Sequence, residues 1–209
     1  FINALTVGEN LALRLYFPDK LKDTKAQLAT IENVGTVQAY LADLSIVSEV
    51  KALANTVKSE QNSIDVLINN AGVALGSDIN NAEQFEKNWQ RSIAIMASAQ
   101  QWAILTALPW LRLAEYPRIV NLASTEALGA TAYNSAYVAA KHASLGLTRA
   151  MSVELGKEGI TVNCICPGPV HTALTAPIPA DHKQTLAQRR TALRRYADPE
   201  EIAHMVLNL

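Results

Sequence analysis

Two side chains that could exchange a proton lie four residues apart in the segment SAYVAAKHAS, residues 135–144. No Gly or Pro occurs from Ser135 to Leu145, so the segment is predicted to be a helix with Tyr137 and Lys141 on one face. Acid/base catalysis requires a side chain that can give a proton to a reacting group and take it back. A free tyrosine has a pKa of about 10, and a nearby ammonium lowers it. The pair is therefore a candidate general acid/base.

The same spacing occurs a second time, as Tyr16 and Lys20 in YFPDK, so the motif alone is weak. Pro18 and Asp19 within this copy favour a turn, and its two side chains need not share a face. We therefore expect the copy at Tyr137 to be the one with the required geometry.

The composition fits a globular chain of one domain, which we expect to span residues 1–209. Apolar residues make up 49% and charged residues 18%, and the formal net charge is −1. This balance gives no electrostatic reason to expect nucleic acid or a membrane surface as a partner. The longest apolar run, Ser92 to Leu111, contains Gln100 and Pro109 and predicts a buried helix. We expect a cytoplasmic location.

Strand-like and helix-like segments alternate along the chain, and several strands are almost continuously apolar. The pattern predicts an α/β fold, a doubly wound parallel sheet (Rossmann-like) with helices on both faces. Residues 171–184 are predicted to be a mobile loop. The predicted strands are 10–16, 36–42, 64–70, 118–124 and 160–166, and the predicted helices are 20–33, 45–60, 81–113, 134–157 and 198–208.

Polar or backbone-permissive residues follow four of the predicted strands. They are Asp43, the NNAG segment at 69–72, Ser124 and the PGPVHT segment at 167–172. In open α/β sheets, ligands bind beyond the carboxyl ends of the strands. Gly72 also permits close approach of the backbone to a ligand. We therefore expect these segments to form one site.

These segments resemble the short-chain dehydrogenase/reductase family. The resemblance rests on DVLINNAG (65–72), YVAAK (137–141), ITVNCICPGPVHT (160–172), DPEEIA (198–203) and the thirteen residues from Ser124 to Tyr137. It implies an NAD(P)-dependent oxidoreductase that acts on a carbonyl or an alcohol. In this family Tyr137 would be the acid/base, Lys141 would also hold the nicotinamide ribose, and Ser124 would hydrogen-bond the substrate oxygen.

The resemblance also implies contacts with the cofactor, while Asn69 is expected to bridge strands. The implied cofactor-binding residues are Asp43 and Leu44 at the adenine, Asn70, Ala71 and Gly72 along the cofactor trough, Tyr137 and Lys141, and Pro167, Gly168, Val170 and Thr172 at the nicotinamide carboxamide.

The end of the predicted second strand bears on the choice of cofactor. NAD-preferring members carry an acid there to hold the ribose hydroxyls. This chain has Leu15 and Tyr16 instead, with Arg14, Lys20 and Lys22 nearby. NADP is therefore favoured over NAD.

Two features depart from the family. The Gly-rich turn is absent, and Gly8-Glu9 is all that separates a possible first strand from the next. A parallel crossover needs a dozen or more residues, so we expect the sequence to lack residues near its start, and also the last strand of the family. The second departure is Met96, which stands where the family has a helical asparagine of the proton relay. Either water with Ser92 or Ser98 rebuilds that relay, or turnover is compromised.

Cys164 and Cys166 are separated by one residue on a predicted strand. We expect them on opposite faces, unable to bond each other, as small buried side chains in a reducing compartment. His171 is the one additional metal-ligand candidate close by, and no metal site is expected.

Three functional readings remain open. The favoured one is an NADP-dependent carbonyl reductase or alcohol dehydrogenase, and the alternative is a weak or inactive dinucleotide-binding sensor or scaffold. Dehydratase or epimerase chemistry is the third. A homo-oligomer, tetramer or dimer, is expected through the helices at 81–113 and 134–157. Residues 173–195 would roof the substrate pocket, with Leu174, Ile178 and Leu186 as an apolar wall.

Overall fold

The computed structural model describes residues 3–7, 10–15, 37–60 and 62–209. The predicted helix at 20–33 and the second Tyr-Lys pair at Tyr16 and Lys20 lie outside the described residues.

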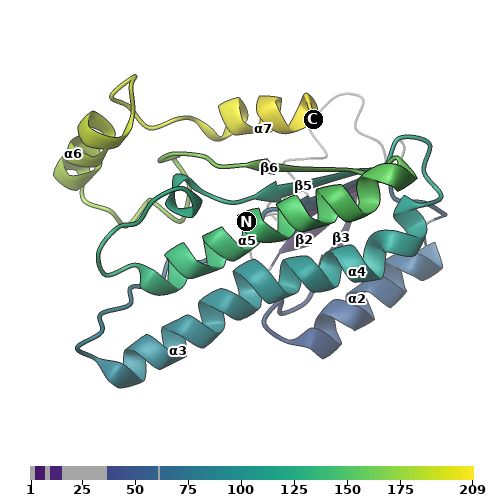
Figure 1. Ribbon diagram of the computed structural model, residues 1–209, viewed down its shortest axis with the longest axis horizontal. Coiled ribbons are helices and arrows are strands. Elements are labelled where there is room, and N and C mark those ends of the chain that lie inside the picture. The colour runs from purple at the N-terminus through teal and green to yellow at the C-terminus, as the bar shows by residue number, and fades with distance from the viewer. Residues whose placement is uncertain (1–2, 8–9, 16–36, 61) are drawn as a thin grey trace.

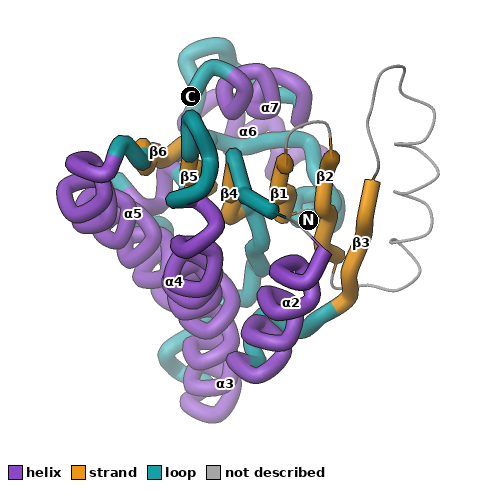
Figure 2. Tube along the Cα trace, turned by 90° about the vertical axis from the view of Figure 1, so that its right-hand side faces the viewer, coloured by secondary structure: helices purple, strands orange, loops and turns teal. Residues whose placement is uncertain are grey.

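A six-stranded sheet forms the centre of the molecule, in the order β3-β2-β1-β4-β5-β6 (Figure 2). The predicted α/β architecture is confirmed, and five of the six strands run in one direction. The strands are β1 (Asn3–Val7), β2 (Asn10–Leu15), β3 (Val37–Leu41), β4 (Val66–Asn69), β5 (Arg118–Leu122) and β6 (Thr161–Ile165).

The central strand β1 differs from the prediction because it pairs antiparallel with both β2 and β4. In the register of β1 and β2, Val7 lies opposite Asn10, so the two strands follow each other as a hairpin. We expected a parallel crossover between these two strands, and that expectation is wrong. An antiparallel pair needs only a short connection.

Helices cover both faces of the sheet (Figure 1). On one face lie α2 (Val47–Glu60), α4 (Ala99–Leu111) and α5 (Ser135–Leu155), and α7 (Pro199–Leu207) lies on the other. The predicted helix at 81–113 consists of α3 (Ala82–Ile93), a π-helical turn (Ala94–Ser98) and α4. The predicted loop at 171–184 was wrong in its second half, because α6 (Ala180–Arg190) begins there.

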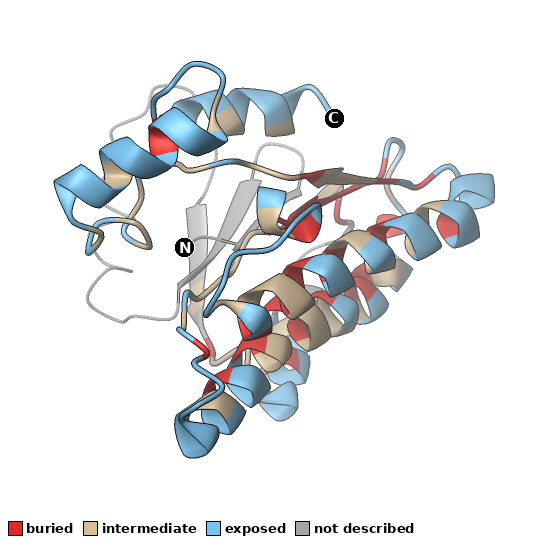
Figure 3. Cartoon of the chain, turned by 60° about the vertical axis from the view of Figure 1, so that its left-hand side comes forward, coloured by how far each residue is buried: buried red, intermediate tan, exposed pale blue. Residues whose placement is uncertain are grey.

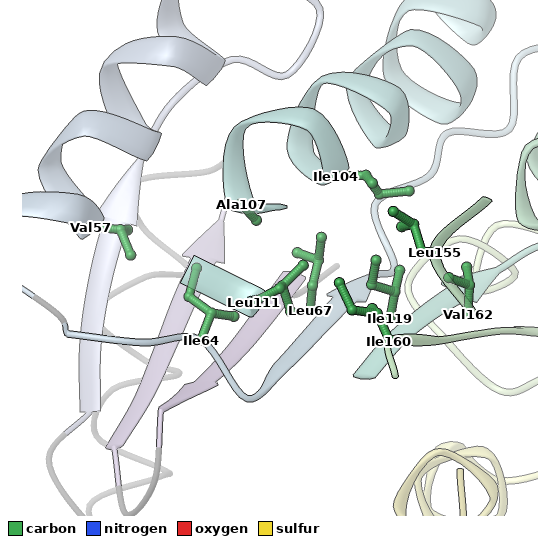
Figure 4. Close-up of a cluster of buried hydrophobic side chains, with 10 residues drawn as sticks. All are labelled: Val57, Ile64, Leu67, Ile104, Ala107, Leu111, Ile119, Leu155, Ile160 and Val162. Atoms are coloured by element: carbon green, nitrogen blue, oxygen red, sulfur yellow. The ribbon is translucent and has the colours of Figure 1, made fainter. Parts of the chain in front are cut away.

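The main core lies between the sheet and α2, α4 and α5 (Figure 4). Leu67, Ile119 and Val162 project from three neighbouring strands toward Ile104 and Leu111 of α4. The opposite face is covered more thinly, by Ile202 and Val206 of α7, and Figure 3 shows that α6 and α7 are mostly exposed. The helices of the main core are therefore the ones held most firmly against the sheet.

A chain of buried polar side chains runs through this core. Asn69 of β4 donates to Asn121 of β5 (2.8 Å), and Asn121 donates to the hydroxyl of Thr148 in α5 (2.9 Å). In the same helix, the hydroxyl of Ser144 donates to the side-chain oxygen of Gln100 in α4 (2.7 Å). The sheet, α5 and α4 are thus joined by side-chain hydrogen bonds as well as by apolar packing.

Replacing Asn121 with alanine is expected to lower the free energy of unfolding by about 3 kcal/mol, because Asn69 and Thr148 would lose a buried partner. Urea unfolding of the parent and the variant measures the change. The exposed Asn62, replaced with alanine, is the control and should unfold like the parent. A parent-like midpoint for Asn121→Ala would show that this chain of hydrogen bonds contributes little.

Candidate active site

The register of three parallel strands aligns the predicted site residues at one edge of the sheet. Asn69 is paired with Asn121, and Asn121 with Cys164, so the segments that follow these residues leave the sheet side by side. Beyond the strands, the Ala123 amide donates to Ile165 (2.8 Å) and the Thr125 amide donates to Pro167 (2.9 Å). The NNAG, Ser124 and PGPVHT segments therefore meet, as the sequence predicted.

Ser124 lies close enough to Tyr137 for its hydroxyl to act on the phenol, where it favours ionisation. Ser124 has extended backbone geometry and precedes the short 3-10 helix Thr125–Ala127, where its hydroxyl accepts from the Glu126 amide at 3.2 Å. Tyr137 lies in the first turn of α5. The thirteen-residue spacing thus corresponds to a strand end, a loop and a helix start that bring the two hydroxyls together.

Lys141 lies one turn further along α5 and is 4% exposed. Its ammonium is 5.6 Å from the centroid of the Tyr137 ring and donates to the carbonyl oxygen of Leu122 at 2.7 Å. An ammonium has three N–H groups, and the structure records one hydrogen bond from Lys141 to the described residues. The other N–H groups can therefore bind a ligand. Lys141 thus fits the role of a group that also binds the sugar of a dinucleotide.

Burial shapes the proton affinity of both groups. It lowers the pKa of Lys141 to about 8, against the opposing effect of the nearby Cys164 and Cys166 thiols. It also raises the pKa of Tyr137, while the hydrogen bond from Ser124 acts to lower it and the charge of Glu126 raises it further. Tyr137 is therefore a protonated phenol at neutral pH, as donation to a carbonyl oxygen requires.

In the chain alone the pKa of Tyr137 shifts upward on balance, although the nearby Lys141 ammonium was expected to lower it. The physical reason is that desolvation of the phenol outweighs the effect of an ammonium that faces the ring and is itself desolvated. Alcohol oxidation, which needs the phenolate, would gain from an additional positive charge at the site.

Met96 is fully buried in the π-helical turn and packs with Ala140 and Tyr137. A Cβ added at Gly72 would lie 3.6 Å from the Met96 sulfur and 3.8 Å from the Lys141 ammonium nitrogen. The thioether therefore lies beside the proposed acid/base, as expected of the relay position. Ser92 is also fully buried, and its hydroxyl has no hydrogen-bond partner among the described residues. The Ser92 hydroxyl is thus unoccupied by the described residues, and a part for Ser92 or the half-buried Ser98 in a rebuilt relay stays a prediction.

The other sequence-predicted cofactor residues follow the ends of three strands. Asp43 and Leu44 lie between β3 and α2, where the Ser45 amide and hydroxyl donate to the Asp43 carboxylate (2.8 and 2.7 Å). Asn69 bridges β4 and β5, as predicted. Asn70, Ala71 and Gly72 follow β4, and Pro167, Gly168, Val170 and Thr172 follow β6.

The prediction that Cys164 and Cys166 lie on opposite faces of a strand is wrong. Residues two apart on a strand share a face, and the Cys164 thiol lies near both the Cys166 thiol and Thr148 of α5. They are half-buried free cysteines, and burial raises the pKa of Cys164.

The predicted roof of the pocket consists of turns at 172–178 followed by α6. Leu174 and Ile178 are half-buried, whereas Leu186 on α6 is exposed. The two side chains in the turns are thus better covered than the one on α6, and their place in a pocket wall stays a prediction.

Sequence reasoning missed Glu126 and Arg190. Glu126 follows Ser124 by two residues, and its carboxylate accepts from the Thr131 hydroxyl (2.7 Å) and pairs with Arg190 of α6 (3.6 Å). A charged residue so close to a candidate catalytic serine was a signal in the sequence. Its pairing with α6 was not, because it depends on how α6 packs.

Within the described part of the chain, no helix is both long and apolar enough to cross a membrane. Nor do three or more His, Cys, Asp or Glu side chains gather there as a metal site.

A family model described as enoyl-(acyl carrier protein) reductase matches residues 8–209. The chain belongs to the short-chain dehydrogenase/reductase family. Members of this family are nicotinamide-dependent oxidoreductases acting on alcohols and carbonyls, and the fold described above agrees with the assignment.

Three similar members of the short-chain dehydrogenase/reductase family illustrate its range. D-beta-hydroxybutyrate dehydrogenase of Rhizobium meliloti (strain 1021) is 36% identical over 186 residues, 88% of this chain and 68% of the relative. Meso-2,3-butanediol dehydrogenase of Serratia marcescens is 34% identical, over 88% of this chain and 72% of the relative. The structure of an actinorhodin polyketide ketoreductase variant with NADPH superposes with a TM-score of 0.82 at 27% identity, covering 95% of this chain and 79% of that one.

Proposed function

We propose that this protein interconverts a carbonyl and an alcohol with NADP, using Tyr137 as general acid/base. The observation that carries the proposal is the arrangement of three side chains at one sheet edge. The Ser124 hydroxyl lies near the Tyr137 phenol and acts on its ionisation, and the buried Lys141 lies one helical turn away.

Each of these residues has one chemical task. Ser124 orients the substrate oxygen by a hydrogen bond, and Tyr137 donates its phenolic proton to that oxygen during reduction. In oxidation, the hydroxyl proton of the alcohol passes to the Tyr137 phenolate. A bound nicotinamide cofactor supplies or accepts the hydride. Lys141 would hold its ribose, and the segments at 43–44, 70–72 and 167–172 would hold the rest.

The preference for NADP rests on the end of β2. Arg14 lies in β2, and Lys20 and Lys22 follow outside the described residues, with no carboxylate before Asp19. The similar ketoreductase variant was solved with NADPH. Basic residues rather than a carboxylate in this stretch of the sequence suit the additional phosphate of NADP.

Met96 supports the alternative function, a weak or inactive dinucleotide-binding sensor or scaffold, because a thioether cannot donate a proton. The intact arrangement of Ser124, Tyr137 and Lys141 favours an active enzyme.

The test is oxidation of NADPH or NADH by the purified protein with a panel of ketones and aldehydes. Turnover with at least a tenfold higher kcat/KM for NADPH is expected. Cofactor binding without turnover on any carbonyl would favour the sensor, and product without net cofactor consumption would favour dehydratase or epimerase chemistry. A preference for NADH would overturn the assignment of NADP.

We also propose a homo-oligomer, tetramer or dimer, in a reducing compartment such as the cytoplasm. The helices expected to pair carry exposed apolar side chains, Trp89 on α3, Leu105 on α4 and Val153 on α5, and both cysteines are free. Sedimentation at micromolar concentration should show the dimer or tetramer, and a monomer alone would contradict it.

A further inference from the structure

The first turn of α5, which carries Tyr137, lacks a cap from its own segment. The N-cap residue Asn134 makes no side-chain hydrogen bond to the helix, although asparagine is among the residues that most often cap one. Tyr133, just before it, has a φ of 61°, in the left-handed region that residues other than glycine rarely adopt. The position of the proposed acid/base therefore depends on what holds this turn.

Ser77 supplies the missing cap from a segment far away in the sequence. Its hydroxyl accepts a hydrogen bond from the amide of Ala136, the second residue of α5, at 3.2 Å. A capping side chain satisfies the amide of the second or third helical residue in the same way. The Ser77 amide donates to the carbonyl oxygen of Tyr133 at 2.9 Å. Ser77 thus holds the chain on both sides of Asn134.

The side chain of Ser77 has a second partner in the same turn. Its hydroxyl lies 2.9 Å from the hydroxyl of Ser135, the first residue of α5, and the two share a hydrogen bond. Ser77 is 3% exposed and Ala136 is fully buried, so water does not readily replace the lost hydroxyl. Without it, the Ala136 amide would be a buried donor with no acceptor, and the first turn would be free to fray.

The loop that carries Ser77 is itself held by α3, which lies beside α5 (Figure 1). The side-chain amide of the buried Asn88 donates to the carbonyl oxygen of Gly76. Gln84 in turn donates to the side-chain oxygen of Asn88 at 2.7 Å. The loop begins after β4 with the segment 70–72, which is predicted to hold the cofactor. It therefore joins the predicted cofactor trough to the start of α5.

We propose that Ser77 is a positioning residue, which fixes the first turn of α5 and thereby keeps the Tyr137 hydroxyl in place beside Ser124. Ser77 acts through the backbone of the helix start, by way of its hydrogen bonds to Tyr133 and Ala136. A displacement of about 1 Å at a catalytic group can lower a rate by about a hundredfold. This inference rests on the proposed function and adds one residue to it.

Ser77→Ala tests the role of the hydroxyl. The kcat for reduction of an accepted ketone with NADPH should fall about tenfold, as a small displacement of the proton donor predicts. NADPH affinity, followed by fluorescence, should stay like that of the parent, because Lys141 and the segment 70–72 are untouched. The kinetics are measured well below the midpoint of thermal unfolding, so that a loss of folded protein does not lower the rate.

Asn81→Ala is the matched control. Asn81 lies in the same loop as Ser77 and caps α3, where its side chain accepts from the Gln84 amide at 3.1 Å. Its replacement removes a helix cap of the same kind from a helix that carries none of the proposed catalytic residues. It should lower the urea midpoint about as much as Ser77→Ala does and leave kcat unchanged.

A double variant separates positioning from a general weakening of the fold. In the Tyr137→Phe background, Ser77→Ala should lower kcat no further, because the hydroxyl that Ser77 positions is already gone. A parent-like kcat for Ser77→Ala, the same loss in Asn81→Ala, or a full further loss in the Tyr137→Phe background would each overturn the positioning role and leave the proposed function standing. No turnover of any carbonyl by the parent would overturn both.

Discussion

Replacing Tyr137 with phenylalanine is expected to lower the rate of carbonyl reduction at least about a hundredfold, the lower range for loss of a positioned general acid. Cofactor affinity should stay nearly unchanged. The ring remains to pack with Met96 and Ala140, and Lys141 is untouched. Steady-state kinetics on an accepted carbonyl measure the rate, and NADPH fluorescence measures binding.

The exposed Tyr116 provides the control for this variant. Tyr116→Phe should behave like the parent, as should Tyr16→Phe in the second Tyr-Lys pair. If Tyr137→Phe turned over like the parent, the pair in α5 would be an ordinary helix face and the proposed function would fall.

The direction of the Tyr137 pKa shift adds a pH signature. Because burial raises this pKa, the phenol stays protonated well above neutral pH. Reduction needs the phenol and should persist into alkaline solution. Oxidation needs the phenolate and should accelerate as pH rises toward the pKa.

Lys141→Ala is expected to lower both the reaction rate and the cofactor affinity, each at least about tenfold, since the loss of one charged hydrogen bond is worth roughly 1.5–3 kcal/mol. The substitution removes one ammonium group that has two proposed roles. Its charge would no longer favour the phenolate, and its N–H groups would no longer hold the ribose. The same kinetic and fluorescence measurements apply.

Because Lys141 is buried and donates to Leu122, alanine would also leave a cavity. Lys141→Met keeps most of the volume and separates the two causes. It should recover stability in urea unfolding without recovering the rate or the affinity. Lys157→Ala, at an exposed lysine, serves as the control. Parent-like cofactor binding by both Lys141 variants would refute the second role.

Much of this site was accessible from the sequence because it depends on local rules. A helix brings Tyr137 and Lys141 to one face, and parallel strands bring Ser124 and the NNAG segment to one edge. The antiparallel direction of β1 was not predicted. Only two residues separate β1 from β2, which is typical of a hairpin, but a hairpin was not considered because an all-parallel sheet was expected. The pairing of Glu126 with Arg190 and the direction of the Tyr137 pKa shift depend on burial and long-range packing, which spacing does not report.

The polar side chains Asn69, Asn121, Thr148, Ser144 and Gln100 have a consequence for the position of α5 along the sheet. Apolar packing alone would allow α5 to slide along the sheet. Each buried hydrogen bond instead requires its donor and acceptor to lie at one position along the helix axis. Displacement of α5 by one turn, about 5.4 Å, would unpair several buried groups together. The same helix carries Tyr137 and Lys141. These hydrogen bonds fix the position of α5 along the sheet and thereby the distance from the Tyr137 hydroxyl to Ser124.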